Sequence, residues 1–245
     1  MDINKLPPDT RHLWQRMQHE TLLQGFVLIG GSALTLRIGH RISEDLDFAY
    51  LGSLLPRQRI SLLRQSLLRE GGAFELNQDI AAEHDFLNAG LDLSDHQQNY
   101  LARGNVKVTF VQLDAEITGL FSGNELQPLR VATLDEIFKT KALVCAERSK
   151  TRDWFDLYIL LTQHGYTIQD MYQAFEQTSR THNFDSACLR LRTCRKSPTD
   201  EGYVHLLEHP PQLDEIRDYF NAAIDEWQVS TACAALKARL TKPQD

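Results

Sequence analysis

The sequence lacks the features that mark membrane and secreted proteins. No apolar run approaches the roughly 18 residues that a membrane span needs, and residues 1–5 lack the basic-then-apolar layout of a signal peptide. The few cysteines show neither CxxC nor zinc-ligand spacing, which predicts free thiols in a reducing compartment. They are Cys145, Cys188, Cys194 and Cys233. We therefore expect a cytoplasmic protein with no membrane contact.

The sequence also has fewer basic than acidic residues, 26 Lys and Arg against 33 Asp and Glu. The net charge of −7 argues against binding nucleic acid through overall charge. Basic residues nevertheless cluster in three places, which fits an anionic ligand held at one local site, although solvated helix faces are the alternative for each cluster. The clusters are Arg37, His40 and Arg41; Lys139, Lys141, Arg148, Lys150 and Arg152; and Arg190, Arg192, Arg195 and Lys196.

What is present is an ordinary globular composition, 42% hydrophobic and 24% charged over 245 residues. All strand patterns lie in the first half, over residues 26–29, 46–51, 74–80, 106–113 and 129–132, and residues 81–104 fit no element well. Helical patterns cover residues 10–24, 33–37 and 57–69, with Leu68 on the apolar face of the third. Beyond residue 133 every periodic segment is helical, over 134–147, 152–163, 167–178, 184–192, 213–227 and 231–240.

These patterns predict an α+β fold with two domains. Residues 1–132 form a small mixed β-sheet with flanking helices, and residues 133–245 form a helical domain that closes the active-site cleft.

A glycine turn follows the first predicted strand. Gly30 and Gly31 let the backbone turn sharply and approach a ligand, and Ser32 is placed to cap the next helix and to offer a hydroxyl donor. A helix N-terminus is a natural phosphate site, because its N–H groups are unpaired and carry partial positive charge. Taken alone, this pattern fits a plain tight turn equally well.

Two carboxylates follow on the next strand. Asp45 and Asp47 are two residues apart, so they point to one face of a strand, while Leu46 and Phe48 pack behind them. Adjacent carboxylates repel unless a cation lies between them, and Mg²⁺ favours such ligands together with substrate phosphates. An acidic strand edge is the alternative. Arg41 is placed to reach phosphates, with a surface arginine as its alternative.

The two motifs together are more specific than either one. Ser32 and Asp45 are separated by the length of one short helix and a return loop, which would bring the glycine turn beside the carboxylates. Metal ligands beside backbone phosphate donors are what in-line transfer at phosphorus requires.

At this point the chain resembles a known family. Residues 30–34 and 41–48 are similar to the signature of the AbiEii/AbiGii toxin family of nucleotidyltransferases, within the DNA polymerase β-like superfamily. A second signature of that family, a lysine-bearing helix followed by Arg-Asp-x-x-Asp, resembles the segment from Lys141 to Asp156. The resemblance implies that Lys141 stabilises the triphosphate and that Asp153 serves near the nucleotide or acceptor. A structural salt bridge is the alternative for Arg152 and Asp156.

The chain departs from the superfamily at one position. These enzymes often carry a third carboxylate on a neighbouring strand, and Thr109 stands where that acid is expected. Asp114 and Glu116, further along, are candidate substitutes; otherwise Asp153 or metal-bound solvent must assist deprotonation.

We therefore expect an Mg²⁺-dependent nucleotidyltransferase that uses an NTP. Asp45 and Asp47 would be catalytic metal ligands, Lys141 and Asp153 further catalytic residues, and Gly30, Gly31, Ser32, Arg41 and Lys141 would bind nucleotide. The resemblance implies an RNA acceptor such as a tRNA 3′ end and a cognate antitoxin. Two alternatives stay open: a non-catalytic nucleotide-binding protein, and a transferase acting on a small molecule or protein.

Overall fold

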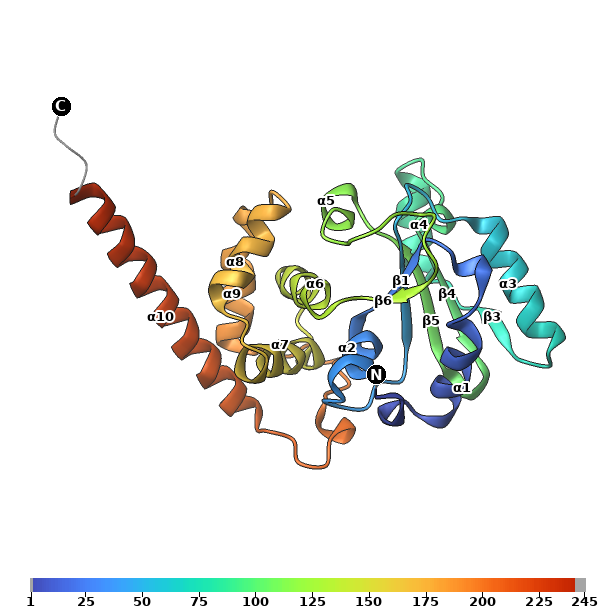
Figure 1. The fold of residues 1–245 in the computed structure, drawn as a ribbon, viewed down its shortest axis with the longest axis horizontal. Coiled ribbons are helices and arrows are strands. Elements are labelled where there is room, and N and C mark those ends of the chain that lie inside the picture. Colours follow the sequence, from blue (N-terminus) through green and yellow to red (C-terminus); the bar gives the residue numbers. More distant parts are fainter. Residues whose placement is uncertain (1, 241–245) are drawn as a thin grey trace. The chain divides into compact units, whose positions relative to one another are not determined.

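The structure is a computed structural model and describes residues 2–240 (Figure 1). The chain divides into two compact units, Met1–Ile137 and Phe138–Asp245, with the boundary inside helix α6. The expected boundary at 132/133 falls just before that helix, and the roles assigned to the two parts stay predictions. The mixed α+β architecture with a helical C-terminal part is confirmed.

The first unit is built on a mixed sheet whose strand order is β3-β4-β5-β2-β1-β6. Strands β1 and β2 are antiparallel, as are β3 with β4 and β4 with β5, whereas β2–β5 and β1–β6 are parallel. In Figure 1, α1 and α3 lie to one side of this sheet and α2 to the other. The strands are β1 Phe26–Ile29, β2 Leu46–Tyr50, β3 Phe74–Leu76, β4 Gln97–Ala102, β5 Lys107–Gln112 and β6 Arg130–Val131.

Helices surround the sheet and make up the second unit. The α-helices are α1 Pro8–Met17, α2 Gly30–Ile38, α3 Arg57–Arg69, α4 Ile80–Asn88, α5 Ala115–Thr118, α6 Leu134–Glu147, α7 Thr151–Gln163, α8 Ile168–Gln177, α9 Phe184–Thr193 and α10 Leu213–Leu240. Short 3₁₀ turns are η1 Ile3–Lys5, η2 Thr21–Leu23, η3 Leu93–Asp95, η4 Arg103–Asn105, η5 Thr181–Asn183 and η6 Val204–Leu206. No helix in residues 2–240 combines the length and apolarity of a membrane span.

One face of the sheet carries an aromatic core. Phe110 stacks on Phe48 with ring centroids 5.5 Å apart and meets Phe26 edge-on at 5.4 Å. Phe74 stacks on Tyr100 at the β3–β4 end. Because strand side chains alternate in direction, burying this row on one face leaves the residues between them on the other face, where Asp47 lies.

Several expected elements differ from the observed ones. The helix expected over residues 10–24 ends at Met17, and a separate 3₁₀ turn, capped by the Glu20 side chain, follows it. Helix α2 begins at Gly30, so Ser32 lies inside its first turn and is not the N-cap. The expected break at residues 228–230 is wrong, because α10 is continuous from Leu213 to Leu240.

The region over residues 74–104 was the hardest to predict. Strand β3 ends at Leu76, and Ile80, expected at a strand end, begins α4. Strand β4 was missed because polar side chains fill part of its buried face. Gln98 is buried there and is held by a bond to the Ser94 carbonyl and by the Tyr100 hydroxyl, which donates to its amide oxygen. In α3, Ile60, Leu63 and Leu67 are buried, whereas Leu68, expected with them, is 40% exposed.

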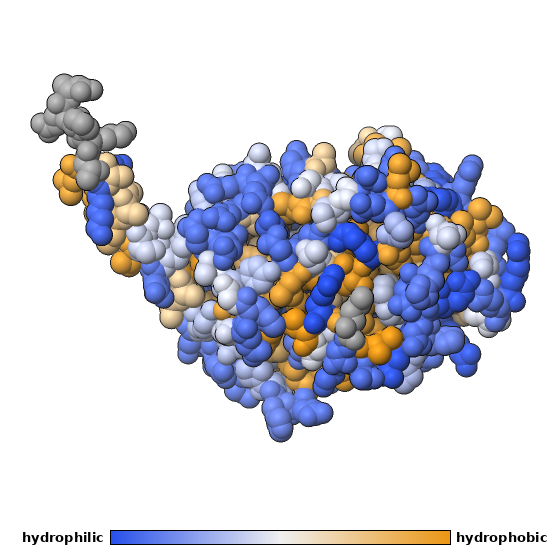
Figure 2. Space-filling model, viewed as in Figure 1, coloured by the Kyte–Doolittle hydropathy of each residue, from blue (hydrophilic) through white to orange (hydrophobic). Residues whose placement is uncertain are grey.

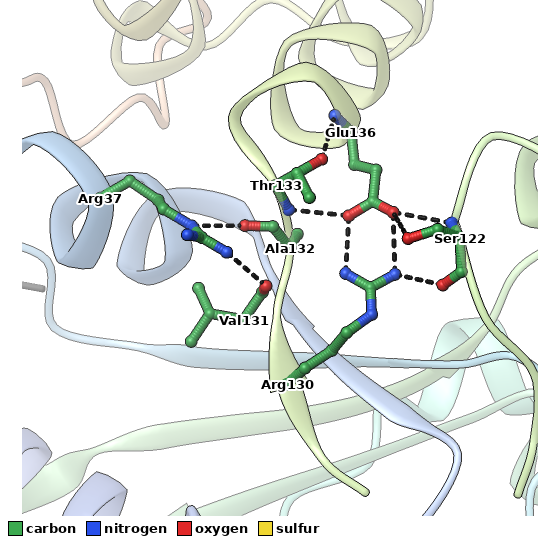
Figure 3. Close-up of polar contacts among 7 residues, drawn as sticks. All are labelled: Arg37, Ser122, Arg130, Val131, Ala132, Thr133 and Glu136. Atoms are coloured by element: carbon green, nitrogen blue, oxygen red, sulfur yellow. Dashed lines mark hydrogen bonds and ion pairs between the residues drawn. The ribbon is translucent and has the colours of Figure 1, made fainter. Parts of the chain in front are cut away.

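A buried glutamate fixes the junction from which α6 begins (Figure 3). Glu136 accepts two bonds from Arg130 and bonds from the Ser122 amide and hydroxyl. Glu136 and Thr133 also exchange reciprocal bonds as a capping box. Burial by itself would raise the pKa of Glu136, but Arg130 and the Thr133 and Ser122 amides outweigh it and hold that pKa at about 2.

Arg37 ties α2 to the same junction. Its guanidinium donates to the carbonyls of Val131 and Ala132 at 2.8 Å each (Figure 3). The helix that begins at the glycine turn is thereby fixed to β6, the edge strand beside β1. The Glu136 cluster and Arg37 together set the position of the glycine turn relative to the sheet.

Glu136→Gln should lower the free energy of unfolding at pH 7 by about 2–3 kcal/mol, because it removes the charge that Arg130 and the amides solvate. The native pKa lies below the unfolded value, so this stabilisation is present above about pH 4.5 and disappears as the pH falls towards 2. Urea unfolding of both proteins between pH 7 and pH 3 measures the gap, which should shrink with acidification. The exposed Glu75→Gln variant is the control, and an equal loss in both variants would contradict this role.

Candidate active site

The glycine turn joins β1 directly to α2. Ile29 occupies the N-cap position without a side-chain capping bond, and Gly30 has a φ of +70° that favours glycine. A Cβ built on Gly30 would lie 2.8 Å from Oδ2 of Asp47, and one on Gly31 would lie 2.6 Å from Nη2 of Arg41. Only glycine lets the carboxylate and the guanidinium come this close to the start of the helix.

The carboxylates Asp45 and Asp47 lie at the N-terminal end of β2. Asp45 precedes the strand and Asp47 is its second residue; both are half-buried, whereas Leu46 and Phe48, which follow them, are buried. Asp47 is the register partner of Ile29 on β1. The predicted convergence of the glycine turn and the second carboxylate is therefore confirmed by the register and by the contact with Gly30.

Ser32 and Arg41 form hydrogen bonds with the backbone of the loop that precedes β2. Ser32 is buried, and its hydroxyl donates a short hydrogen bond to the Asp45 carbonyl and lies 3.0 Å from the Ser43 hydroxyl. Arg41 is only 4% exposed and donates to the Ile42 carbonyl, so the surface-arginine alternative is wrong. Thr35 donates to the Arg41 carbonyl, which fixes the loop against α2. The Ser32 and Arg41 side chains therefore hold the loop that carries Asp45. Their contacts with nucleotide stay predictions.

Thr109 occupies the position beside Asp47 on the neighbouring strand. The β2–β5 register pairs Asp47 with Thr109, and the β4–β5 register pairs Thr109 with Asn99. These three polar side chains therefore lie in one row on the same face of the sheet. Asn99 was missed from the sequence because β4 itself was not recognised.

Asp114 and Glu116 do not replace the third carboxylate. Asp114 is five positions after Thr109, roughly 16 Å along an extended chain, and both acids lie beyond the opposite end of β5. Asp114 caps α5 by accepting from the Ile117 amide, and both acids are exposed. Among the residues described, no group of three or more His, Cys, Asp or Glu side chains could hold a metal.

The residue types at β2 suit a magnesium–triphosphate complex on a two-carboxylate site. Asp45 and Asp47 offer hard carboxylate oxygens two residues apart, and the missing Cβ of Gly30 leaves space at the Asp47 carboxylate. Mg²⁺ completes its coordination with water and phosphate oxygens, so two carboxylates suffice.

The second unit contains a separate buried ionic cluster. Lys141 on α6 contacts Asp153 at 2.8 Å and Asp156 at 2.6 Å, both on α7, and all three side chains are at most 8% exposed. Arg148, half-exposed, donates from Nε to Asp153 at 2.9 Å. Burial would raise the pKa of Asp153, but the charges of Lys141 and Arg148 outweigh it and lower that pKa. The expectation that Lys141 and Arg148 share a face is met, since both reach Asp153.

Arg152 and Asp156 each form a structural salt bridge within the helical unit, as the alternative for these two residues predicted. Asp156 is fully buried against Lys141, whereas Arg152 donates to the Gly202 carbonyl and pairs with Glu201. The four cysteines are free thiols, as expected, and Cys145 lies buried near this cluster.

Comparison with known protein families assigns this chain to one of them. Residues 12–233 match the family model described as nucleotidyl transferase AbiEii toxin, type IV TA system. The chain belongs to this AbiEii family and is a nucleotidyltransferase of the toxin type.

Individual relatives are distant. A protein of uncharacterised function from Aquifex aeolicus (strain VF5) is 23% identical over 227 residues, covering 92% of this chain and 98% of that one. A crystal structure of a proposed nucleotidyltransferase from H. pylori is 20% identical, with a TM-score of 0.48 over 86% of this chain and 90% of that one. The nucleotidyltransferase toxin MenT4 from Mycobacterium tuberculosis H37Rv is 14% identical, with a TM-score of 0.49 over 86% and 82%.

A pair of glycine variants tests the close approach at the turn. Gly30 and Gly90 have similar φ values, +70° and +75°, but a Cβ on Gly90 meets no atom within 4 Å. Both alanine variants should lose about 1 kcal/mol of stability from backbone strain. Only Gly30→Ala should also lose NTP binding, by at least about tenfold, because its methyl group displaces the Asp47 carboxylate. Calorimetric titration with NTP and Mg²⁺ measures this, and equal binding by the two variants would contradict it.

The ionic cluster makes a separate prediction. Lys141→Met should lower the free energy of unfolding by about 3–5 kcal/mol, because it removes the buried cation that contacts both Asp153 and Asp156. Arg148→Met should cost less than about 1 kcal/mol, since its side chain is 52% exposed. Chemical denaturation of both variants measures the difference. Similar stabilities would show that Lys141 does not neutralise the buried pair.

Proposed function

We propose that this enzyme transfers a nucleotidyl group from an NTP to a hydroxyl of an RNA acceptor, with Asp45 and Asp47 as ligands of Mg²⁺. The observation that carries the site assignment is the contact between the Asp47 carboxylate and the turn at the start of α2. Phosphate donors and metal ligands are thereby within reach of one triphosphate. The bound metal would neutralise phosphate charge and orient the reacting group.

Residues at the start of α2 and in the following loop would bind the phosphates and position the metal ligands. Gly30 and Gly31 leave the first amides of α2 accessible to phosphate oxygens, and the helix dipole favours negative charge there. Arg41 lies against Gly31 and adds a fixed positive charge at the same place. Ser32 holds the Asp45 backbone through its hydroxyl, so its contribution includes positioning of a metal ligand.

Lys141 and Asp153 are proposed as further catalytic residues on their match to the second family signature. In the structure Lys141 is bound to Asp153 and Asp156. Its proposed contact with triphosphate therefore requires it to exchange a carboxylate for a phosphate oxygen. Thr109 has no acidic group, so removal of the acceptor proton rests on Asp153 or on metal-bound solvent.

The acceptor and the biological system rest on family membership. The family description names toxins of toxin–antitoxin systems, which supports an antitoxin encoded beside this chain. We propose an RNA acceptor such as a tRNA 3′ end, and small-molecule or protein acceptors are the outcomes that would replace it. The basic cluster at residues 190–196 gives little support to RNA contact, because Arg190 binds Ser149 and Arg192 binds Asp225.

Isosteric variants test the carboxylates directly. Asp45→Asn and Asp47→Asn should each lower label transfer from NTP to total RNA by about 10³-fold, or about 4 kcal/mol of barrier, because each loses a charged metal ligand. Each labelled NTP is tested separately with Mg²⁺, and labelled products are separated by size and nuclease sensitivity. The exposed neighbour Glu44→Gln is the matched control and should retain transfer.

Two results would contradict the proposal in different ways. Transfer that persists unchanged in the Asp45→Asn/Asp47→Asn double variant would disprove the metal site. Label that appears only in protein or in small molecules would keep the site and disprove the RNA acceptor.

A further inference from the structure

The last helix has two faces of different character. In its first half, Ile216, Phe220 and Ile224 are buried, and α10 packs there against α7, α8 and α9. Trp227 continues this packed face: its indole donates to Gln169, and its ring lies against Phe184. From Gln228 to Leu240 every residue is exposed. Figure 1 shows this part of α10 extending beyond α7 to α9.

The exposed half carries an apolar stripe that does not continue the packed face. At 100° per residue, the packed face continues through the small residues Thr231, Ala234, Ala235 and Ala238. The large apolar side chains lie on the opposite side of the helix. They are Val229, Leu236 and Leu240, which are 64%, 59% and 85% exposed, with the exposed Cys233 between them. Figure 2 shows orange side chains on this end of α10.

We call Val229, Cys233, Leu236 and Leu240 the stripe. The charged residues beside it change from acidic to basic along the helix. Acidic residues, including Asp225 and Glu226, precede it, and the last turn carries Lys237 and Arg239. Asp225 is bound to Arg192, whereas Glu226 and Lys237 are exposed towards the two ends, on one flank of the stripe. A parallel pair of such helices brings like charges together. An antiparallel pair places the acidic end of one beside the basic end of the other.

We propose that the stripe is the docking surface for a second copy of this chain, paired antiparallel about a two-fold axis near Ala232 and Cys233. This register places Val229 against Leu236 of the partner subunit and Glu226, on the same flank of the stripe as Lys237, beside Lys237 of the partner subunit. Because a two-fold interface uses the same patch twice, the chain supplies both the apolar stripe and the complementary charges. The small residues Ala232 and Cys233 at the axis allow the helices to approach closely.

Sedimentation equilibrium of the full chain over a wide concentration range is the first test. The wild type should show reversible dimerisation, and Leu236→Glu should raise the dimer dissociation constant at least about 100-fold, because it buries a charge in the stripe. Leu189→Glu, an exposed leucine on α9 outside the stripe, is the matched control and should dimerise normally. A wild type that stays monomeric up to about 1 mM overturns the proposal.

Charge reversal tests the register. Glu226→Lys and Lys237→Glu should each weaken the dimer about tenfold, and the double reversal should restore it to within about threefold, since the facing pair is then re-formed. Additive losses in the double variant overturn this pairing.

Spin labels test the orientation. In a Cys233→Ser background, labels attached at Leu240→Cys should lie roughly 20 Å or more apart in an antiparallel dimer, from the rise of 1.5 Å per residue. The other cysteines are buried and escape labelling. A short separation of about 10 Å indicates a parallel pair and overturns the proposal. A monomer that instead binds the product of an adjacent reading frame through Leu236 assigns the stripe to that protein and also overturns it.

Discussion

The contact between the Asp47 carboxylate and the glycine turn is the constraint on which the candidate site depends. Asp47 and Ile29 are register partners, so the carboxylate lies where β1 gives way to α2. A side chain at Gly30 would occupy the position of that carboxylate. The turn therefore brings together a helix N-terminus, which attracts phosphate, and a carboxylate, which attracts metal. These two preferences are satisfied at once only by a ligand that carries both, such as a metal–triphosphate complex.

The surrounding structure keeps this contact in place. Ser32 holds the Asp45 backbone, Thr35 holds the Arg41 backbone, and Arg37 fixes the same helix to β6. Two side chains of α2 thus hold the loop that leads to β2, and a third holds the end of β6. The Glu136 cluster holds the same region. The Glu136 carboxylate binds both Arg130 and Ser122, next to the carbonyls of Val131 and Ala132 that Arg37 binds. Positioning in this site comes largely from hydrogen bonds to backbone carbonyls.

Elements that depend on local motifs could be predicted from the sequence. Elements whose position depends on tertiary contacts could not. The strand at residues 26–29, the helices at 57–69 and 134–147, and the pairing of Asp47 with the glycine turn follow from short-range patterns. Strand β4 could not be predicted, because Gln98 is buried only through bonds to Ser94 and Tyr100. The roles of Glu136 and Arg37 depend on partners in other segments. The Thr133–Glu136 capping pattern was the one local signal that could have drawn attention to Glu136.

The central claim, that Asp45 and Asp47 together hold the metal that accompanies NTP, is tested most directly by binding of Mn²⁺ as a spectroscopic substitute. Electron paramagnetic resonance of Mn²⁺ with NTP should show a protein-bound ternary complex in the wild type. In folded Asp45→Asn/Asp47→Asn protein, the spectrum should be that of Mn²⁺–NTP in solution. An unchanged protein-bound signal in the double variant would contradict the account.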